Sequence, residues 1–124
     1  MADLPKVGLI RSSRHRKHPQ ANLRGIQVDK KLVPLLEALW DSGFDTQWSC
    51  QGHPVEYAIL PIAGYSYILF YSSEQAFEFL QRTGPKINDV QDMMSIRLQL
   101  MTDGRGGVQF PPALLDEITN IWTC

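Results

Sequence analysis

The sequence predicts one α+β domain, in which a small antiparallel or mixed sheet of four to five strands packs against three helices. The chain has 124 residues, a length typical of one domain. Hydrophobic residues make up 44% and charged residues 20%, which are ordinary globular values and exclude a wholly disordered chain. Apolar residues recur at helical spacing in three segments and alternate with polar residues in others, which indicates helices and strands together.

A short edge strand at residues 25–28 and then a helix begin the folded body. Five apolar residues recur three and four positions apart, as on one helix face: Leu32, Leu35, Leu36, Leu39 and Trp40. Proline is tolerated in the first helical turn, so Pro34 predicts that this helix begins between residues 30 and 33. Gly43 ends it.

Two strands and a second helix are predicted next. Residues 46–50 and 65–71 have the composition of strands. The connection between them, residues 54–64, is predicted to be a functional loop with a brief extended piece at 57–60. A capping-box pattern then predicts a helix over residues 74–83.

The last third of the chain predicts a hairpin and a final helix. Residues 95–101 alternate between apolar and polar side chains, as in a strand with one buried face. A glycine-rich turn at 103–107 leads to a strand at 108–110, and Pro111 and Pro112 open the last helix. The order of elements resembles a ferredoxin-like arrangement with an added strand and helix.

Charge is distributed unevenly, although the net charge is only −1. Residues 1–31 hold eight of the twelve Lys and Arg residues and two of the thirteen Asp and Glu residues. We therefore divide the chain into a basic arm, residues 1–25, and one α+β body, residues 26–124. Such an arm suits nucleic acid, an acidic partner or its own acidic body.

The sequence indicates a soluble cytoplasmic protein, either a monomer or a homodimer, with no membrane contact. Its first ten residues lack the pattern of a secretory signal, and no apolar run approaches the ~18 residues of a membrane span. Cys50 and Cys124 are too few and too far apart to indicate a disulfide framework.

The strongest candidate binding site is a loop at the end of the strand predicted at residues 46–50. It consists of Ser49, Cys50, Gln51, Gly52 and His53. The loop places a thiol, an amide, a flexible glycine and an imidazole at a strand end, where sites often form.

Several explanations of this loop stay open. Cys50 and His53 have the spacing of a metal-binding pair, but zinc needs three or four protein ligands; His15, His18 and Cys124 are the others in the sequence. Alternatively, His53 activates Cys50 as a nucleophile, or the loop is a plain structural turn. We expect a structural or binding role, and predict no catalytic residue, no metal and no cofactor.

A nucleic-acid interface is the alternative to protein binding. The arm carries four basic side chains that suit phosphate contact: Arg11, Arg14, Arg16 and Lys17. If the strand at 95–101 turns its apolar side inward, its other face shows Arg97 near Tyr67 and Tyr71, as in an RNA-stacking sheet. The same tyrosines also fit a core or a protein interface.

Four segments stand out together: residues 40–44, the Ser-Cys-Gln-Gly-His loop, the strand at 67–70 and residues 108–112. Through them the chain resembles, over about residues 28–123, small accessory proteins of actinobacteriophages, of the mycobacteriophage type, and of their hosts. The resemblance implies a phage accessory protein made in the host cytoplasm. We therefore expect a non-enzymatic module that binds a host or phage protein, with nucleic-acid binding as the alternative. A small enzyme or metal protein centred on Cys50 and His53 is the third class.

Overall fold

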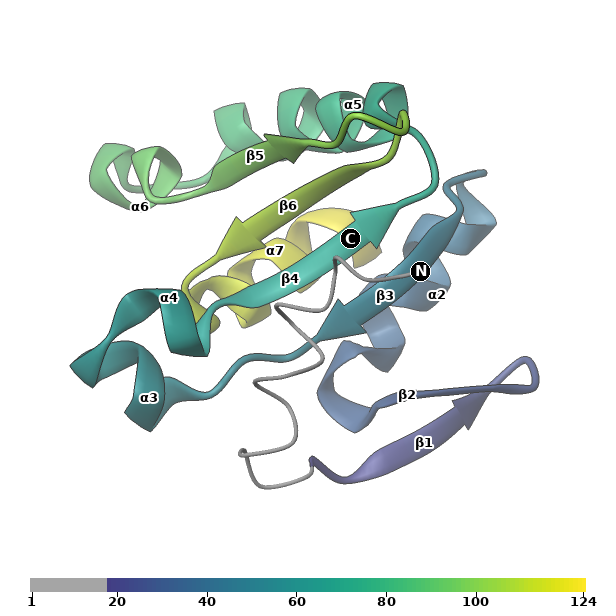
Figure 1. Ribbon diagram of the computed structural model, residues 1–124, viewed down its shortest axis with the longest axis horizontal. Helices are drawn as coiled ribbons and strands as arrows, with labels where there is room; N and C mark the ends of the chain where they lie inside the picture. Colours follow the sequence, from purple (N-terminus) through teal and green to yellow (C-terminus); the bar gives the residue numbers. More distant parts are fainter. Residues whose placement is uncertain (1–17) are drawn as a thin grey trace.

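The computed structural model describes residues 18–124, which form two antiparallel sheets and the helices around them (Figure 1). The larger sheet has the strand order β3-β4-β6-β5, with β3 at Thr46–Cys50, β4 at Ser66–Phe70, β5 at Arg97–Leu100 and β6 at Gly106–Phe110. The smaller sheet is a hairpin of β1, Gln20–Leu23, and β2, Ile26–Asp29. The predicted α+β class is confirmed.

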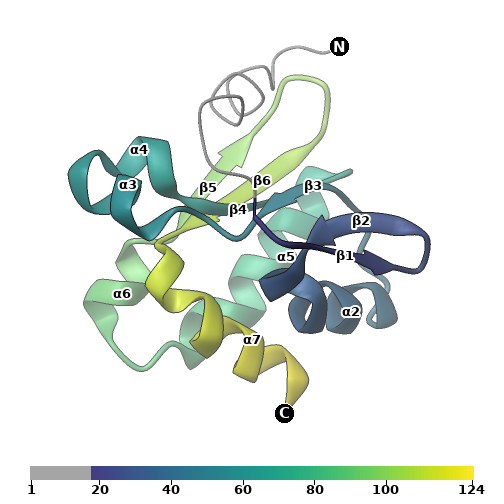
Figure 2. The same cartoon turned by 90° about the horizontal axis from the view of Figure 1, so that it is seen from below.

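Three helices cover one face of the larger sheet (Figure 2). They are α2, Val33–Asp41, α5, Ser73–Thr83, and α7, Leu115–Thr123. Three shorter helices complete the described chain: α3, Pro54–Ile59, α4, Pro61–Gly64, and α6, Val90–Met94. Single 3₁₀ turns lie before α2 at Lys30–Leu32, after α5 at Gly84–Lys86 and before α7 at Pro112–Leu114. Across residues 18–124, every helix is too short or too polar to traverse a lipid bilayer.

The core lies between the larger sheet and its three helices. Alternate residues of β4 and β6 face it, and the register places Ile68 opposite Val108, both fully buried. Phe79 of α5 is also fully buried and stacks on Trp122 of α7, with 5.5 Å between ring centroids. Burial of one such side chain stabilises the fold by about 1.5–3 kcal/mol.

The ferredoxin-like arrangement is not formed, because β2 does not join the larger sheet. It pairs instead with β1 through a two-residue turn at Arg24 and Gly25, whose φ angles are 54° and 90°. Two positive φ values match the tight turn that suits the twist of a hairpin. The preceding strand therefore gives β2 a nearer partner than the larger sheet does.

Because of this hairpin, the folded body begins earlier in the chain than the sequence predicted. Residues 20–25, which the sequence assigned to the basic arm, form β1 and the turn. Leu23 of β1 and Val28 of β2 are both buried in the main core. The part of the predicted arm that the structure describes from residue 20 onward therefore belongs to the body.

Two further sequence predictions were wrong in detail. Residues 54–64 form α3 and α4 rather than a loop with an extended piece, because Pro54 and Pro61 each open a short helix. In β5, Leu98 packs against the core as expected, but Leu100 is 62% exposed. β5 is an edge strand, so its residues have a neighbouring strand on one side only.

Candidate metal centre

The candidate binding loop lies at the end of β3, where the chain turns into α3. Gly52 has a φ of +88°, and a Cβ there would lie 2.5 Å from Ser66 Oγ, so the position requires glycine. This turn brings the side chains on either side of it together. Cys50 Sγ lies 4.0 Å from Nε2 of His53, the residue that precedes α3.

His18 joins this pair from the start of the described chain. Its Nε2 lies 3.9 Å from Cys50 Sγ, and its ring stacks on the His53 ring with 4.3 Å between centroids. The donor atoms of the three side chains all lie within 4.8 Å of one another, and all three residues are half-buried. The structure therefore assembles two imidazoles and one thiol that are up to 35 positions apart.

The separations suit a shared transition-metal ion. Tetrahedral zinc, with bonds of about 2.3 Å to sulfur and 2.0–2.1 Å to nitrogen, sets its sulfur and nitrogen ligands about 3.5 Å apart. The observed 3.9 and 4.0 Å exceed this by about 0.5 Å or less. Imidazole and thiolate are also the ligand types that zinc prefers.

The backbone also contacts the sulfur of Cys50. The backbone N–H of Gly52 donates a hydrogen bond to Cys50 Sγ at 3.4 Å. This contact helps to hold the sulfur beside the two imidazoles. Cys124, the other thiol, is exposed at the end of α7 and is not in the cluster, and His15 lies outside the described residues.

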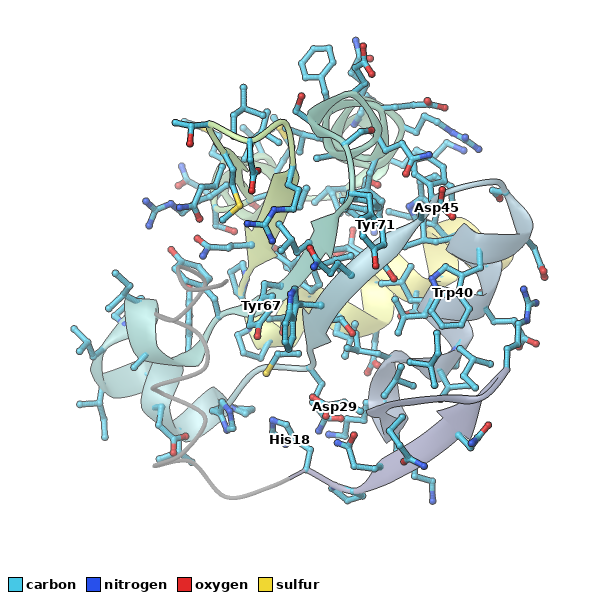
Figure 3. The ribbon with its side chains drawn as sticks, turned by 45° about the vertical axis from the view of Figure 1, so that its right-hand side comes forward. His18, Asp29, Trp40, Asp45, Tyr67 and Tyr71 are labelled. Atoms are coloured by element: carbon cyan, nitrogen blue, oxygen red, sulfur yellow. The ribbon has the colours of Figure 1, made fainter. Side chains whose placement is uncertain are left out.

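Gln51 ties the loop to the β1–β2 hairpin. Its backbone N–H donates to Asp29 Oδ2 at 3.0 Å, and its side-chain oxygen accepts the backbone N–H of Lys31 at 3.2 Å. Asp29 Oδ2 also lies 3.9 Å from His18 Nε2, and Figure 3 shows these two side chains next to each other. The two segments that carry the cluster are therefore held together by hydrogen bonds as well.

Ser49, the first residue of the candidate loop, does not join the cluster. It lies opposite Ile68 in the β3–β4 register, and directly opposite residues share one face of a sheet. Ser49 thus belongs to the helix-covered face, whereas Cys50 belongs to the other face. Of the predicted loop, Cys50 and His53 supply donor atoms to the cluster, and Gln51 and Gly52 position them.

The residues predicted for a nucleic-acid interface are only partly brought together. Tyr67, Gln109 and Arg97 are register partners across β4, β6 and β5, so they share the face that α2, α5 and α7 leave uncovered. The guanidinium of Arg97 lies 5.6 Å from the centroid of the Tyr65 ring. Tyr71 follows β4 and is 58% exposed. The predicted Tyr67–Arg97 face exists.

The basic residues of the arm are not part of this description. Arg11, Arg14, Arg16 and Lys17 lie outside the described residues. Nucleic-acid binding through them stays a prediction.

Comparisons of the chain with protein-family models, with curated proteins and with solved structures give no match. The resemblance to actinobacteriophage accessory proteins therefore stays a prediction, and so does the partner that it implies. Convergence of His18, Cys50 and His53 is the most informative feature of the molecule for its function.

Proposed function

We propose that this protein binds a zinc ion, or a transition-metal ion of similar ligand preference, through His18, Cys50 and His53. The observation that supports this proposal is the approach of their donor atoms to within 4.8 Å of one another. The proposal replaces the expectation that the chain holds no metal. It selects the third of the predicted classes, a Cys/His-centred metal protein.

Ordinary packing explains the same geometry less well. The Nε2 atoms of both histidines approach one sulfur atom, at 3.9 and 4.0 Å. These separations are at the outer limit of a hydrogen bond to sulfur, so each contributes little as a hydrogen bond. They are close to the separation of two ligands on one ion. A bound ion would therefore turn two weak contacts into two strong bonds.

Metal titration of the purified full-length chain, stripped beforehand with a chelator, tests the proposal. We expect one Co²⁺ or Zn²⁺ ion per chain, with a thiolate-to-cobalt charge-transfer band in the ultraviolet. His18→Ala, Cys50→Ser and His53→Ala should each weaken binding strongly, because each removes one of three protein ligands. Cys124→Ser is the matched control and should bind as the wild type does. A wild-type chain without the band, or a Cys50→Ser chain that keeps it, would contradict the proposal.

Protein binding is a second candidate function, supported by exposed apolar side chains on α3 and α4. Val55, Ile59, Leu60 and Ile62 are 68%, 81%, 56% and 59% exposed. A group of large aliphatic side chains in water is typical of an interaction surface. This surface supports binding to a protein; the expectation that the partner is a host or phage protein comes from the resemblance alone.

A pulldown from actinobacterial host lysate tests this second function, with size-exclusion chromatography to separate it from self-association. The informative variant is Ile59→Lys combined with Ile62→Lys, and Phe77→Lys on α5 is the control for a charge added elsewhere. We expect a nuclease-resistant protein band that the double variant loses and the control keeps. A band that survives the double variant would exclude this surface.

A further inference from the structure

We infer that the carboxylate of Asp29 is the fourth ligand of the proposed metal centre, and that the centre is therefore closed. The inference rests on the proposed function, because it needs an ion held by His18, Cys50 and His53. Its consequence concerns chemistry: zinc with four protein ligands is structural, whereas zinc with three keeps a position for water or substrate.

The first argument is the atom of His18 that Asp29 faces. Asp29 Oδ2 lies 3.9 Å from Nε2, the nitrogen that also lies 3.9 Å from Cys50 Sγ. A carboxylate that merely orients a ligand histidine contacts the other ring nitrogen, away from the metal. Asp29 is therefore on the metal side of the imidazole, in the position of a co-ligand.

The second argument is the setting of the carboxylate. Asp29 precedes the 3₁₀ turn Lys30–Leu32, where an aspartate often caps the first turn, but its side chain makes no such bond. It is turned instead toward the cluster, with 11% of the side chain exposed. Gln51 donates to one oxygen and Gln20 to the other.

The third argument is charge. Within residues 18–124, the side chain close enough to form an ion pair with Asp29 is His18, and no Lys or Arg does so. A carboxylate removed from water needs a positive partner, and a divalent cation supplies one. With Cys50 as thiolate and Asp29 as carboxylate, the two ligand charges would neutralise the ion.

The fourth argument is reach. Oxygen and nitrogen ligands of tetrahedral zinc are about 3.4 Å apart, and the 3.9 Å between Asp29 and His18 exceeds this by about 0.5 Å. Asp29 is not among the donor atoms that all lie within 4.8 Å of one another, so its carboxylate must also move toward Cys50 or His53 to bind the same ion. The oxygen that moves can keep its hydrogen bond from Gln51, because a carboxylate oxygen has two lone pairs. His18, just before the hairpin, and Asp29, at the end of the hairpin, would then share the ion with Cys50 and His53.

An exchange experiment on the Co²⁺-loaded chain tests whether the fourth position is closed. Azide is added to the wild type, to Asp29→Asn, to Asp29→Ala and to Asp45→Asn, the last being a surface control. We expect the visible cobalt bands of the wild type and of the control to stay unchanged. Asp29→Ala should respond to azide, because the anion would take the vacated position. Zinc affinity of Asp29→Ala should fall by about 100-fold or more, at or beyond the upper end of the 10–100-fold loss typical of outer-shell residues.

Two results would overturn the inference while leaving the proposed function intact. One is a wild-type cobalt spectrum that shifts with azide, which would mean an open position and would make Asp29 a neighbour of bound water. The other is an Asp29→Asn chain whose zinc affinity matches that of the wild type. A wild-type chain with no thiolate-to-cobalt band would overturn the proposed function, and this inference with it. Denaturant unfolding of each variant checks that it is folded.

Discussion

The two sides of this molecule are held together in different ways. On one side, α2, α5 and α7 pack on the larger sheet through fully buried apolar side chains such as Phe70 and Phe79. On the other, the hairpin meets the loop after β3 through directional contacts of Asp29, Gln51 and His18. The stability of the first side comes from many apolar contacts, which do not depend on direction. Leu23 and Val28 anchor the hairpin in the apolar core, but its contact with the loop depends on a few polar atoms. One substitution at these atoms can therefore disturb the contact while the fold persists.

The largest expected effect is in the apolar core. Phe79→Ala should lower the free energy of unfolding by about 3–5 kcal/mol, since it empties a fully buried site between Phe70 and Trp122. Urea denaturation measures it. Phe77→Ala on the same helix is the control; Phe77 is 50% exposed, and its loss should be about 1 kcal/mol or less. Equal losses in the two variants would contradict this account of the core.

Stabilisation by bound metal is the next largest expected effect, and it distinguishes the proposed metal centre from the apolar core. At a free zinc concentration 100 times the dissociation constant, the wild type should gain about 2.7 kcal/mol of unfolding free energy over the metal-free chain. Cys50→Ser should show no gain, whereas a folded Phe79→Ala chain should keep it. Thermal unfolding with zinc and with a chelator measures both. A gain that Cys50→Ser retains would place the ion elsewhere.

Gly52→Ala should lower both the stability of the fold and the affinity for zinc. The new Cβ would collide with Ser66 Oγ and Pro112, so we expect a loss of about 1–3 kcal/mol together with weaker zinc binding. Gly104→Ala is the matched control, because Gly104 has a similar φ of +95° and open space around it. The difference between the two variants isolates the collision from the backbone strain. Similar losses would mean that strain alone matters.

The smallest expected effect is on acid stability at an exposed turn. The side-chain hydrogen bond from Arg105 lowers the pKa of Asp103 below its ordinary value of 3.8. Its stabilising effect is therefore complete at neutral pH and is lost as the pH falls through the folded-state pKa. Wild type should slightly exceed Asp103→Asn in stability at pH 7, and this difference should shrink below about pH 4. A stability difference that grows as the pH falls would contradict a lowered pKa for Asp103.

The two sides also differ in how far sequence predicts them. The leucine spacing of α2 and the strand Thr46–Cys50 were predictable, because each pattern depends on neighbours a few residues away. The position of His18 beside Cys50 was not, since 32 residues separate them and no local pattern links them. The sequence showed no sign of the contacts of Asp29 either, because they depend on the direction in which its side chain points.

One clue to the hairpin was present in the sequence. Arg24 and Gly25 are two turn residues between short segments, and Gly25 suits the positive φ that a two-residue turn requires. Pairing residues 20–23 with 26–29 across this turn would have moved the start of the body and brought His18 toward it. The charge pattern of the first 31 residues masked this clue, because it suggested a solvated arm.

Gly64 connects the proposed metal centre to the apolar surface of α3 and α4. Its carbonyl oxygen accepts the backbone N–H of His53 at 3.0 Å, and a Cβ at Gly64 would lie 2.5 Å from the His53 carbonyl oxygen. The backbone of α4 therefore lies directly against His53, whose imidazole belongs to the proposed metal centre, at the start of α3. If binding of a partner moves His53 relative to His18 and Cys50, the partner changes metal affinity, and the ion changes partner affinity by the same factor. Metal supply in the cell would then set how strongly the protein engages its partner.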